Sequence, residues 1–244
     1  MRRYAQSTSS DENLKTDRIC YRRFVSEVHA EPVNRLERRK QRTRAALIQA
    51  AQALIAAGKL NVPVLEITQA ADVGMGSFYN HFESKEQLFD AAVAEVLDTH
   101  GALLDQLTAS VDDPAEAFAS RFRLTGRLFR RRPQETQILL TATGLSLIAS
   151  DRGLAPRALR DITAAIQAGR FHVDDPDLAL AVAAGSLMGL GKLLQTQPER
   201  DDATAADRVT EDLLRLFGMS AADAREICQR PLPDLGAAQP DSAT

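Results

Sequence analysis

Apolar residues recur every three or four positions along most of the chain, which is the spacing of one face of an α-helix. Proline, glycine and paired aspartates interrupt this pattern where helices are expected to begin or end. Alanine and leucine dominate the composition and aromatic residues make up only 5% of it. We therefore expect an all-α protein, with helices at 35–57, 64–71, from 75, 85–107, 114–131, 133–150, 154–168, 178–194, 203–217 and 221–229.

The stretch 67–85 reads ITQAADVGMGSFYNHFESK and combines two short helical patterns with a break between them. Phe78 and Phe82 are four residues apart, so both fall on the same, inward face of the second helix. The residues left to point outward are Met75, Ser77, Tyr79 and Asn80. Two helices joined by a tight turn, the second with a free outer face, predict a helix-turn-helix for the DNA major groove.

Residues 71–88, ADVGMGSFYNHFESKEQL, resemble the signature of the tetracycline-repressor (TetR) family of bacterial regulators. The resemblance implies an N-terminal three-helix helix-turn-helix domain joined to a larger C-terminal helical domain for ligand binding and dimerisation. On this basis we expect a flexible extension at 1–34, the DNA-binding domain at 35–83, the effector-binding and dimerisation domain at 84–230, and a disordered tail at 231–244.

The expected DNA contacts follow from the resemblance and from side-chain chemistry. Met75 can read only an apolar surface such as a thymine methyl group, whereas Asn80 can pair with adenine. Tyr79 and His81 offer donors to phosphates, or alternatively serve packing and capping. The expected DNA-binding residues are Arg42, Met75, Gly76, Ser77, Tyr79, Asn80, His81 and Lys85.

The turn departs from the family pattern at two positions. Asp72 stands where glycine is usual, and Gly74 stands where a serine-like N-cap is usual. Aspartate tolerates the left-handed conformation and glycine is an acceptable cap, so we expect the turn to form. Pro63, Val64 and Leu65 replace polar residues of the preceding helix, which leaves open whether that helix contacts DNA.

Charge is distributed unevenly along the chain, whose net charge is −3. Residues 1–44 hold twelve lysines and arginines against six acidic residues, a local charge of +6. Residues 45–244 hold eighteen lysines and arginines against twenty-seven acidic residues, a local charge of −9. Such an excess at one end fits phosphate contact by that end, and it equally fits a solvated basic tail.

The segment 178–194 is apolar around its whole circumference and therefore must be buried on all sides. In the TetR family the corresponding late helices form a two-fold dimer interface; the alternative is an ordinary monomer core. A homodimer would place two recognition helices about 34–36 Å apart and predict a near-palindromic operator on double-stranded DNA. The expected dimer residues are Ala184, Leu187, Met188, Gly191, Leu213 and Phe217.

Two further apolar stripes lie on 114–131 and 133–150. In the family they surround a cavity for a small-molecule effector, although a filled core gives the same pattern. Few charges fall on these stripes, so we expect an apolar or amphipathic effector. The expected ligand-binding residues are Phe118, Phe122, Phe129, Ile138, Leu139, Ala142 and Leu145.

The sequence gives no indication of an enzyme, because its four histidines are scattered and no nucleophile, phosphate-loop or HExxH pattern occurs. Cys20 and Cys228 are far apart, so we expect no metal site, no cofactor and a reducing, cytoplasmic location. The uncharged run 178–191 is too short for a membrane span, so no membrane partner is expected. We expect a DNA-binding repressor; the alternative is a helical protein-interaction module that has lost specific DNA binding.

Overall fold

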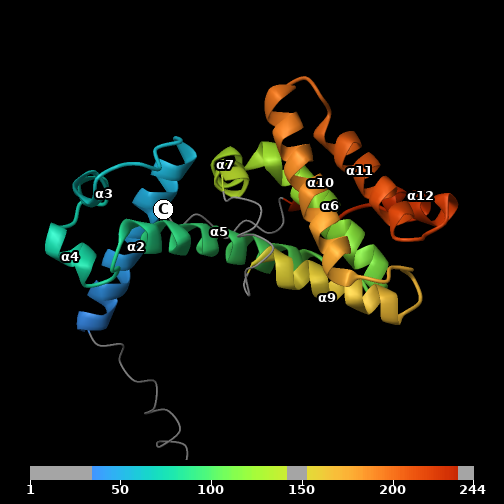
Figure 1. The fold of residues 1–244 in the computed structure, drawn as a ribbon, viewed down its shortest axis with the longest axis horizontal. Helices are drawn as coiled ribbons and strands as arrows, with labels where there is room; N and C mark the ends of the chain where they lie inside the picture. Colours follow the sequence, from blue (N-terminus) through green and yellow to red (C-terminus); the bar gives the residue numbers. More distant parts are fainter. Residues whose placement is uncertain (1–34, 142–152, 236–244) are drawn as a thin grey trace, which may run out of the picture. The chain divides into compact units, whose positions relative to one another are not determined.

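The computed structural model describes residues 35–141 and 153–235, and all its elements over these ranges are α-helices (Figure 1). This confirms the all-α prediction. The helices are α2 (Arg35–Ala56), α3 (Val64–Ala70), α4 (Met75–Tyr79), α5 (Lys85–Leu107), α6 (Pro114–Arg131), α7 (Pro133–Thr141), α9 (Leu154–Gln167), α10 (Pro176–Thr196), α11 (Asp202–Leu216) and α12 (Ala221–Gln229).

The helix ends lie within a few residues of the predicted positions, because local chemistry sets them. Asp113 and Asp175 are N-caps whose carboxylates accept backbone N–H bonds, and each is followed by a proline in the first helical turn. Gly58 and Gly169 follow α2 and α9 with φ of 73° and 67°, a conformation that favours glycine. The predicted helix 133–150 is described only as far as Thr141.

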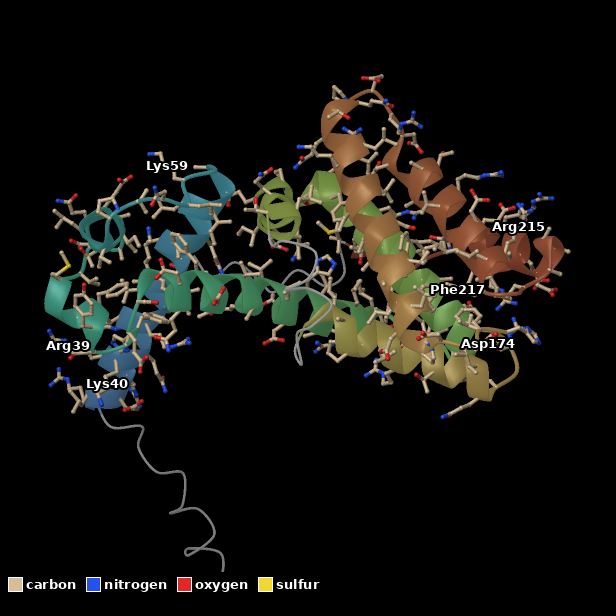
Figure 2. All side chains as sticks on the ribbon, viewed as in Figure 1. Arg39, Lys40, Lys59, Asp174, Arg215 and Phe217 are labelled. Carbon is tan, nitrogen blue, oxygen red and sulfur yellow. The ribbon has the colours of Figure 1, made fainter. Side chains whose placement is uncertain are left out.

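The chain divides after Thr43. On the N-terminal side the structure describes Arg35–Thr43, the first turns of α2. The arginines and the lysine of these turns are exposed, and Arg39 and Lys40 project from the ribbon (Figure 2). The C-terminal side begins at Arg44 and contains the rest of α2 and the other helices.

Apolar residues from α2, α3 and α4 form the core beneath the helix-turn-helix. Leu47, Ile67 and Phe78 have no exposed surface, and Phe82 is 3% exposed. Leu88, in the first turns of α5, is fully buried in the same cluster. The short helices α3 and α4 are thus held by packing, since helices of five to seven residues have little stability alone.

The other helices pack around α6, which contacts α9, α10 and α11 (Figure 1). Four phenylalanines form the centre of this body. Phe118 of α6 lies 5.7 Å from both Phe171 and Phe217, and these two rings are 5.2 Å apart. Phe122 adds a further ring 6.4 Å from Phe118. Aromatic pairs at such distances contribute about 0.5–1.5 kcal/mol beyond their buried area.

Buried arginines join α6 to the two last helices. Arg123, 4% exposed, donates from Nε to Asp207 of α11 at 2.7 Å and from Nη1 to the carbonyl of Arg230 at 3.0 Å, just after α12. Arg127 donates to the same Asp207 carboxylate at 2.9 Å. The guanidinium of Arg123 is paired with Asp207 and also donates to the backbone at the end of α12. The position of α12 is therefore fixed by hydrogen bonds as well as by packing.

The apolar helix α10 is longer than the sequence pattern indicated. It has 21 residues and, judged by length and composition only, is long and apolar enough to cross a membrane. The expectation that this segment is too short for a span is therefore wrong. Core helices of soluble proteins share both properties. Only 33% of its most apolar stretch is buried in the protomer, so the expectation of burial on all sides is also wrong for a single chain.

His100 of α5 is a buried polar residue of this body, 1% exposed, and its Nε2 lies 3.2 Å from the Thr125 hydroxyl. Thr125 donates its own proton to the carbonyl of Arg121 at 2.9 Å, so the imidazole N–H is the donor to Thr125. Burial, together with the nearby Arg132 charge, lowers the pKa of His100 from 6.5 to about 4.

His100 should make the protein less stable as the pH falls from about 6.5 to about 4. In this range the unfolded chain binds a proton at this histidine and the folded chain does not, so up to roughly 3 kcal/mol of stability is lost. We expect His100→Gln to remove this part of the pH dependence in urea denaturation measured from pH 7.5 to 4.5. The exposed His172→Gln is the control, and equal pH slopes for wild type and His100→Gln would contradict the prediction.

Candidate functional site

The turn between α3 and α4 has the conformation that its sequence requires. Asp72 is the non-glycine residue with positive φ, 51°, within the described ranges, and the N–H of Val73 donates to the carbonyl of Thr68 at 3.0 Å. Gly74 is the N-cap of α4 in an extended conformation. Both expectations for this departure from the family pattern are confirmed: the turn forms with aspartate in the left-handed region and glycine as the cap.

Helix α4 presents its outward residues to solvent. Met75 is 41% exposed and Tyr79 is 61% exposed, whereas Phe78 between them is fully buried. Gly76 and Asn80 are also exposed, and Ser77 and His81 are partly exposed. A Cβ at Gly76 would meet nothing within 4 Å, so packing inside the protomer does not require glycine there. Contact of these residues with DNA remains a prediction.

The residues that follow α4 fix the start of α5. Ser84 is the N-cap and accepts from the N–H of Gln87 at 3.1 Å, as in a capping box. The Gln87 side chain accepts from the N–H of Glu83 at 2.6 Å, one residue earlier than in the usual box. Lys85 is partly exposed and donates to the side chain of Asn61 at 3.1 Å, which orients its charge.

Arg42 of α2 belongs to the same prediction, and Arg44 lies two residues after it. Arg42 is exposed. Arg44 lies with its guanidinium 5.3 Å from the centre of the Phe82 ring, a cation–π contact that was not predicted from the sequence. Arg44 is also exposed, so it combines a contact with the helix-turn-helix core and the exposure that Arg42 shows.

A cavity of about 110 Å³ lies between α6, α9 and α10. Its walls are mainly apolar, and an apolar cavity of about 150 Å³ is known to hold a benzene ring. The cavity is somewhat smaller than that and of the order of size of one small ring. Its apolar lining consists of Leu104, Phe118, Phe122, Phe129, Leu139, Leu154, Ala155, Ala158, Leu180, Ala183, Ala184, Leu187 and Met188.

One part of the cavity wall is polar. It contains Arg121 and Thr125 of α6 and Arg157 and Asp161 of α9. Arg121 pairs through Nη1 with Asp161, which is only 6% exposed. The Arg121 Nε–H is buried without a hydrogen-bond partner among the described residues. An unpaired buried donor is costly to the folded protein.

Asp105, near the end of α5, joins the arginines behind this wall. Its carboxylate lies 2.7 Å from Arg157, 3.2 Å from Arg121 and 3.2 Å from Arg160. Burial raises the pKa of Asp105, but the hydrogen bonds from Arg157 and Arg160 and the charge of Arg121 lower it, and the net direction is downward. The carboxylate is thus ionised at neutral pH and compensates the arginine charges.

The predicted ligand residues are divided by the structure. Phe118, Phe122, Phe129 and Leu139 line the cavity. Ile138 is buried, 2% exposed, but does not line it. Ala142 and Leu145 lie outside the described residues. The polar wall was missed because Arg121 and Asp161 carry charges, which on an amphipathic helix usually indicate a solvated face.

The structure divides the predicted dimer residues: Gly191, Leu213 and Phe217 are buried in the protomer, whereas the other three are partly exposed. Leu213 and Phe217 are 3% and 2% exposed, and a Cβ at Gly191 would lie 2.9 Å from Leu140 Cδ2. Ala184, Leu187 and Met188 line the cavity. The buried residues are engaged within one chain, and contact of Ala184, Leu187 and Met188 with a second copy remains a prediction. The exposed apolar side chains of the same two helices are Leu178, Val182, Leu193 and Leu216.

No group of histidine, cysteine, aspartate and glutamate side chains within 35–141 and 153–235 could hold a metal ion. Cys228 is buried, and burial raises the pKa of its thiol to about 11, so its reactive thiolate is scarce at neutral pH.

The chain matches two family models: bacterial regulatory proteins of the tetR family over residues 47–92, and the tetracyclin repressor-like C-terminal domain over residues 113–230. No curated protein sequence matches it significantly.

Solved structures give a closer comparison. RolR in complex with resorcinol is 36% identical, with 81% of this chain and 98% of RolR covered and a TM-score of 0.65. RolR without ligand is 35% identical, with 78% and 98% covered and a TM-score of 0.66. A putative tetR family regulator from Shewanella sp. PV-4 shares the fold at 15% identity, with 72% and 97% covered and a TM-score of 0.61.

The helix-turn-helix at α3 and α4, the helical body behind it and the match to RolR over almost its full length agree with one another. The chain belongs to the TetR family of bacterial transcriptional regulators.

Proposed function

We propose that this regulator binds a near-palindromic operator as a homodimer and leaves it when a small hydroxylated aromatic molecule occupies the cavity. The observation that carries the proposal is the polar wall of an otherwise apolar, ring-sized cavity. Repression is the commonest behaviour in the family, and release by an effector is the usual way in which such a protein responds.

Operator binding is supported by the exposure of α4. The residues that face solvent there include an apolar group, an amide and a phenol, which together can read base edges and grip phosphates. Lys85 lies at the N-terminus of α5, where backbone N–H groups favour an anion. The other candidate is a protein-interaction module that has lost specific DNA binding. For such a module, substitution of these side chains would leave the affinity for DNA unchanged.

A hydroxylated ring fits the cavity better than a purely apolar ligand. A phenolic hydroxyl is both a donor and an acceptor, so its oxygen can accept from an arginine of the polar wall while its O–H donates to the carboxylate of Asp161. The ring itself would lie among Phe118, Phe122 and Leu180. RolR, solved with resorcinol, supports the same ligand class for this chain.

The homodimer is supported by the exposed face of α10. Leu178, Val182, Gly185, Gly189 and Leu193 follow one another at intervals of three or four residues and so share one face. Leu178 is 62% exposed, and a Cβ at either glycine would meet nothing within 4 Å. An apolar stripe with a smooth centre suits close approach by the same helix of a second copy, as expected for a two-fold interface.

The DNA-binding role predicts that Tyr79→Ala and Lys85→Ala weaken operator binding. Operators would first be selected from genomic fragments and should be near-palindromic. Loss of one phosphate contact at Lys85 should weaken binding about tenfold and reduce the slope of log K against log salt by about 1. Arg208→Ala, which removes an exposed charge from α11, is the control for net charge. Unchanged affinity in both variants would exclude this assignment of α4 and Lys85.

The dimer interface predicts that Leu193→Arg shifts the protein toward monomers without unfolding it. Leu193 is 36% exposed, so an arginine there is tolerated in the protomer but places a charge in the proposed apolar interface. Sedimentation equilibrium should show a dimer dissociation constant raised at least about tenfold, and operator affinity should fall with it. Thr196→Arg, three residues on and exposed, is the control, and dimers of unchanged stability in Leu193→Arg would refute this surface.

The effector site predicts that Ala183→Leu prevents ligand binding. Ala183 is 4% exposed and lines the cavity, so the larger side chain enters existing space and the melting temperature should be retained. Resorcinol, the probe, should raise the melting temperature of the wild type by mass action and bind Ala183→Leu at least about tenfold more weakly. Ala102→Leu on the exposed face of α5 is the control. Equal resorcinol binding by wild type and Ala183→Leu would place the ligand elsewhere.

A further inference from the structure

Gly101, in the interior of α5, lies against the guanidinium of Arg157, an arginine that lines the cavity. A Cβ added at Gly101 would lie 2.8 Å from Cζ and Nη1 of Arg157 and 2.9 Å from its Nε. These separations are shorter than any that a real side chain adopts, so the guanidinium of α9 can rest on α5 only because residue 101 has no side chain. Glycine is the least favourable residue inside a helix after proline, so this position costs α5 some stability.

The close approach lets Arg157 bind α5 and its own helix at the same time. Its Nε donates to Asp105 Oδ2 at 2.7 Å, and its Nη1 donates to the carbonyl of Gly153 at 2.6 Å. Asp105 is four residues after Gly101, so the two lie one above the other on the same face of α5. Gly101 supplies the space for the guanidinium and Asp105 supplies its counter-charge.

Arg157 also belongs to the polar wall of the cavity, beside Arg121 and Asp161. Arg121 reaches the same Asp105 carboxylate through Nη2 at 3.2 Å. Both arginines that a ligand can meet are therefore bound to a single carboxylate of α5. Asp105 itself does not line the cavity, so a ligand can act on α5 through these arginines.

Helix α5 continues from this point to the helix-turn-helix. Its N-cap is Ser84, two residues after the core residue Phe82, and its first turns place Leu88 and Ala92 in the core cluster that contains Phe78. No break occurs in the helix between Lys85 and Leu107. A displacement of Asp105 is therefore a displacement of the helix that supports α4.

We propose that Gly101 is a positioning residue for the effector response. It allows Arg157 to pack against α5, and this contact couples occupancy of the cavity to the helix that carries the DNA-binding segment. This inference rests on the proposed function of the cavity. A ligand hydroxyl that takes a hydrogen bond from Arg157 weakens the Arg157–Asp105 pair, and the two conformations of the protein then differ in ligand affinity. Such a difference is what allosteric coupling requires.

The test is the effect of Gly101→Ala on the coupling between ligand and operator. The added methyl group must displace the guanidinium, and because this is the end of a flexible side chain the displacement is cheap. Alanine also favours the helix, so the melting temperature should not fall. The quantity measured is the ratio of operator dissociation constants with and without saturating resorcinol. We expect about tenfold or more for the wild type and less than about threefold for Gly101→Ala.

A double-mutant cycle separates positioning from a general structural effect. Arg157→Ala alone should lower the ratio as Gly101→Ala does, and adding Gly101→Ala to Arg157→Ala should change it no further, because the glycine acts only through that arginine. Ala102→Ser, at the exposed neighbouring position of α5, should leave the ratio at the wild-type value. If Gly101→Ala were to lose its fold, Arg157→Ala, which keeps the glycine, would still decide whether the pair carries the coupling.

The outcomes distinguish this inference from the proposed function. A wild-type ratio of one, with no binding of resorcinol or related phenols, would refute the proposed effector response itself. A wild type that responds, with Gly101→Ala or Arg157→Ala responding equally, would overturn the role of Gly101 and leave the proposed function standing. A further loss of coupling when Gly101→Ala is added to Arg157→Ala would also overturn it.

Discussion

The structure depends on how α5 is held at its two ends. Near its start the helix is held by apolar packing, with Leu88 in the core that contains Phe78 and Phe82. Near its end it is held by charge, with Asp105 bound to arginines of α6 and α9. Apolar contacts resist displacement over short distances and change little with ligand chemistry, whereas paired charges can exchange partners. The same helix is therefore firmly packed near its start and adjustable near its end.

The cavity combines two properties that are seldom found together. Phenylalanines and leucines make it suitable for a ring, yet it contains an arginine–aspartate pair whose burial is costly. The body can keep these charges because each has a partner: Asp161 and Asp105 both pair with Arg121. The remaining Nε–H of Arg121 is buried without a hydrogen-bond partner among the described residues.

The helix-turn-helix could be predicted closely because its determinants are local. The positive φ of Asp72, the cap at Ser84 and the inward pair Phe78 and Phe82 each follow from one or two residues and their neighbours. Helix ends could be predicted for the same reason. The charged wall could not, because nothing local indicates that Arg121 is covered by α9 and paired with a carboxylate forty residues later.

The sequence also could not predict which apolar residues of the last helices are buried and which are exposed. Leu213 and Leu216 lie three residues apart on α11, and the structure buries the first and leaves the second 63% exposed. Both positions are leucine, so hydrophobicity alone assigns them to the same side. Only the packing of α11 on α6 and α12 decides which leucine is free, and that packing depends on contacts between distant parts of the chain.

Helix α4 separates the residues that hold it from the residues that it displays. Its place is set by the buried Phe78, whereas Met75, Gly76 and Tyr79 have little to pack against within the protomer. Substitutions at the displayed positions thus alter the chemistry offered to a partner at little cost in folding. In evolutionary terms, a lineage can redirect such a regulator to new target genes through a few point mutations while its ligand chemistry is inherited unchanged.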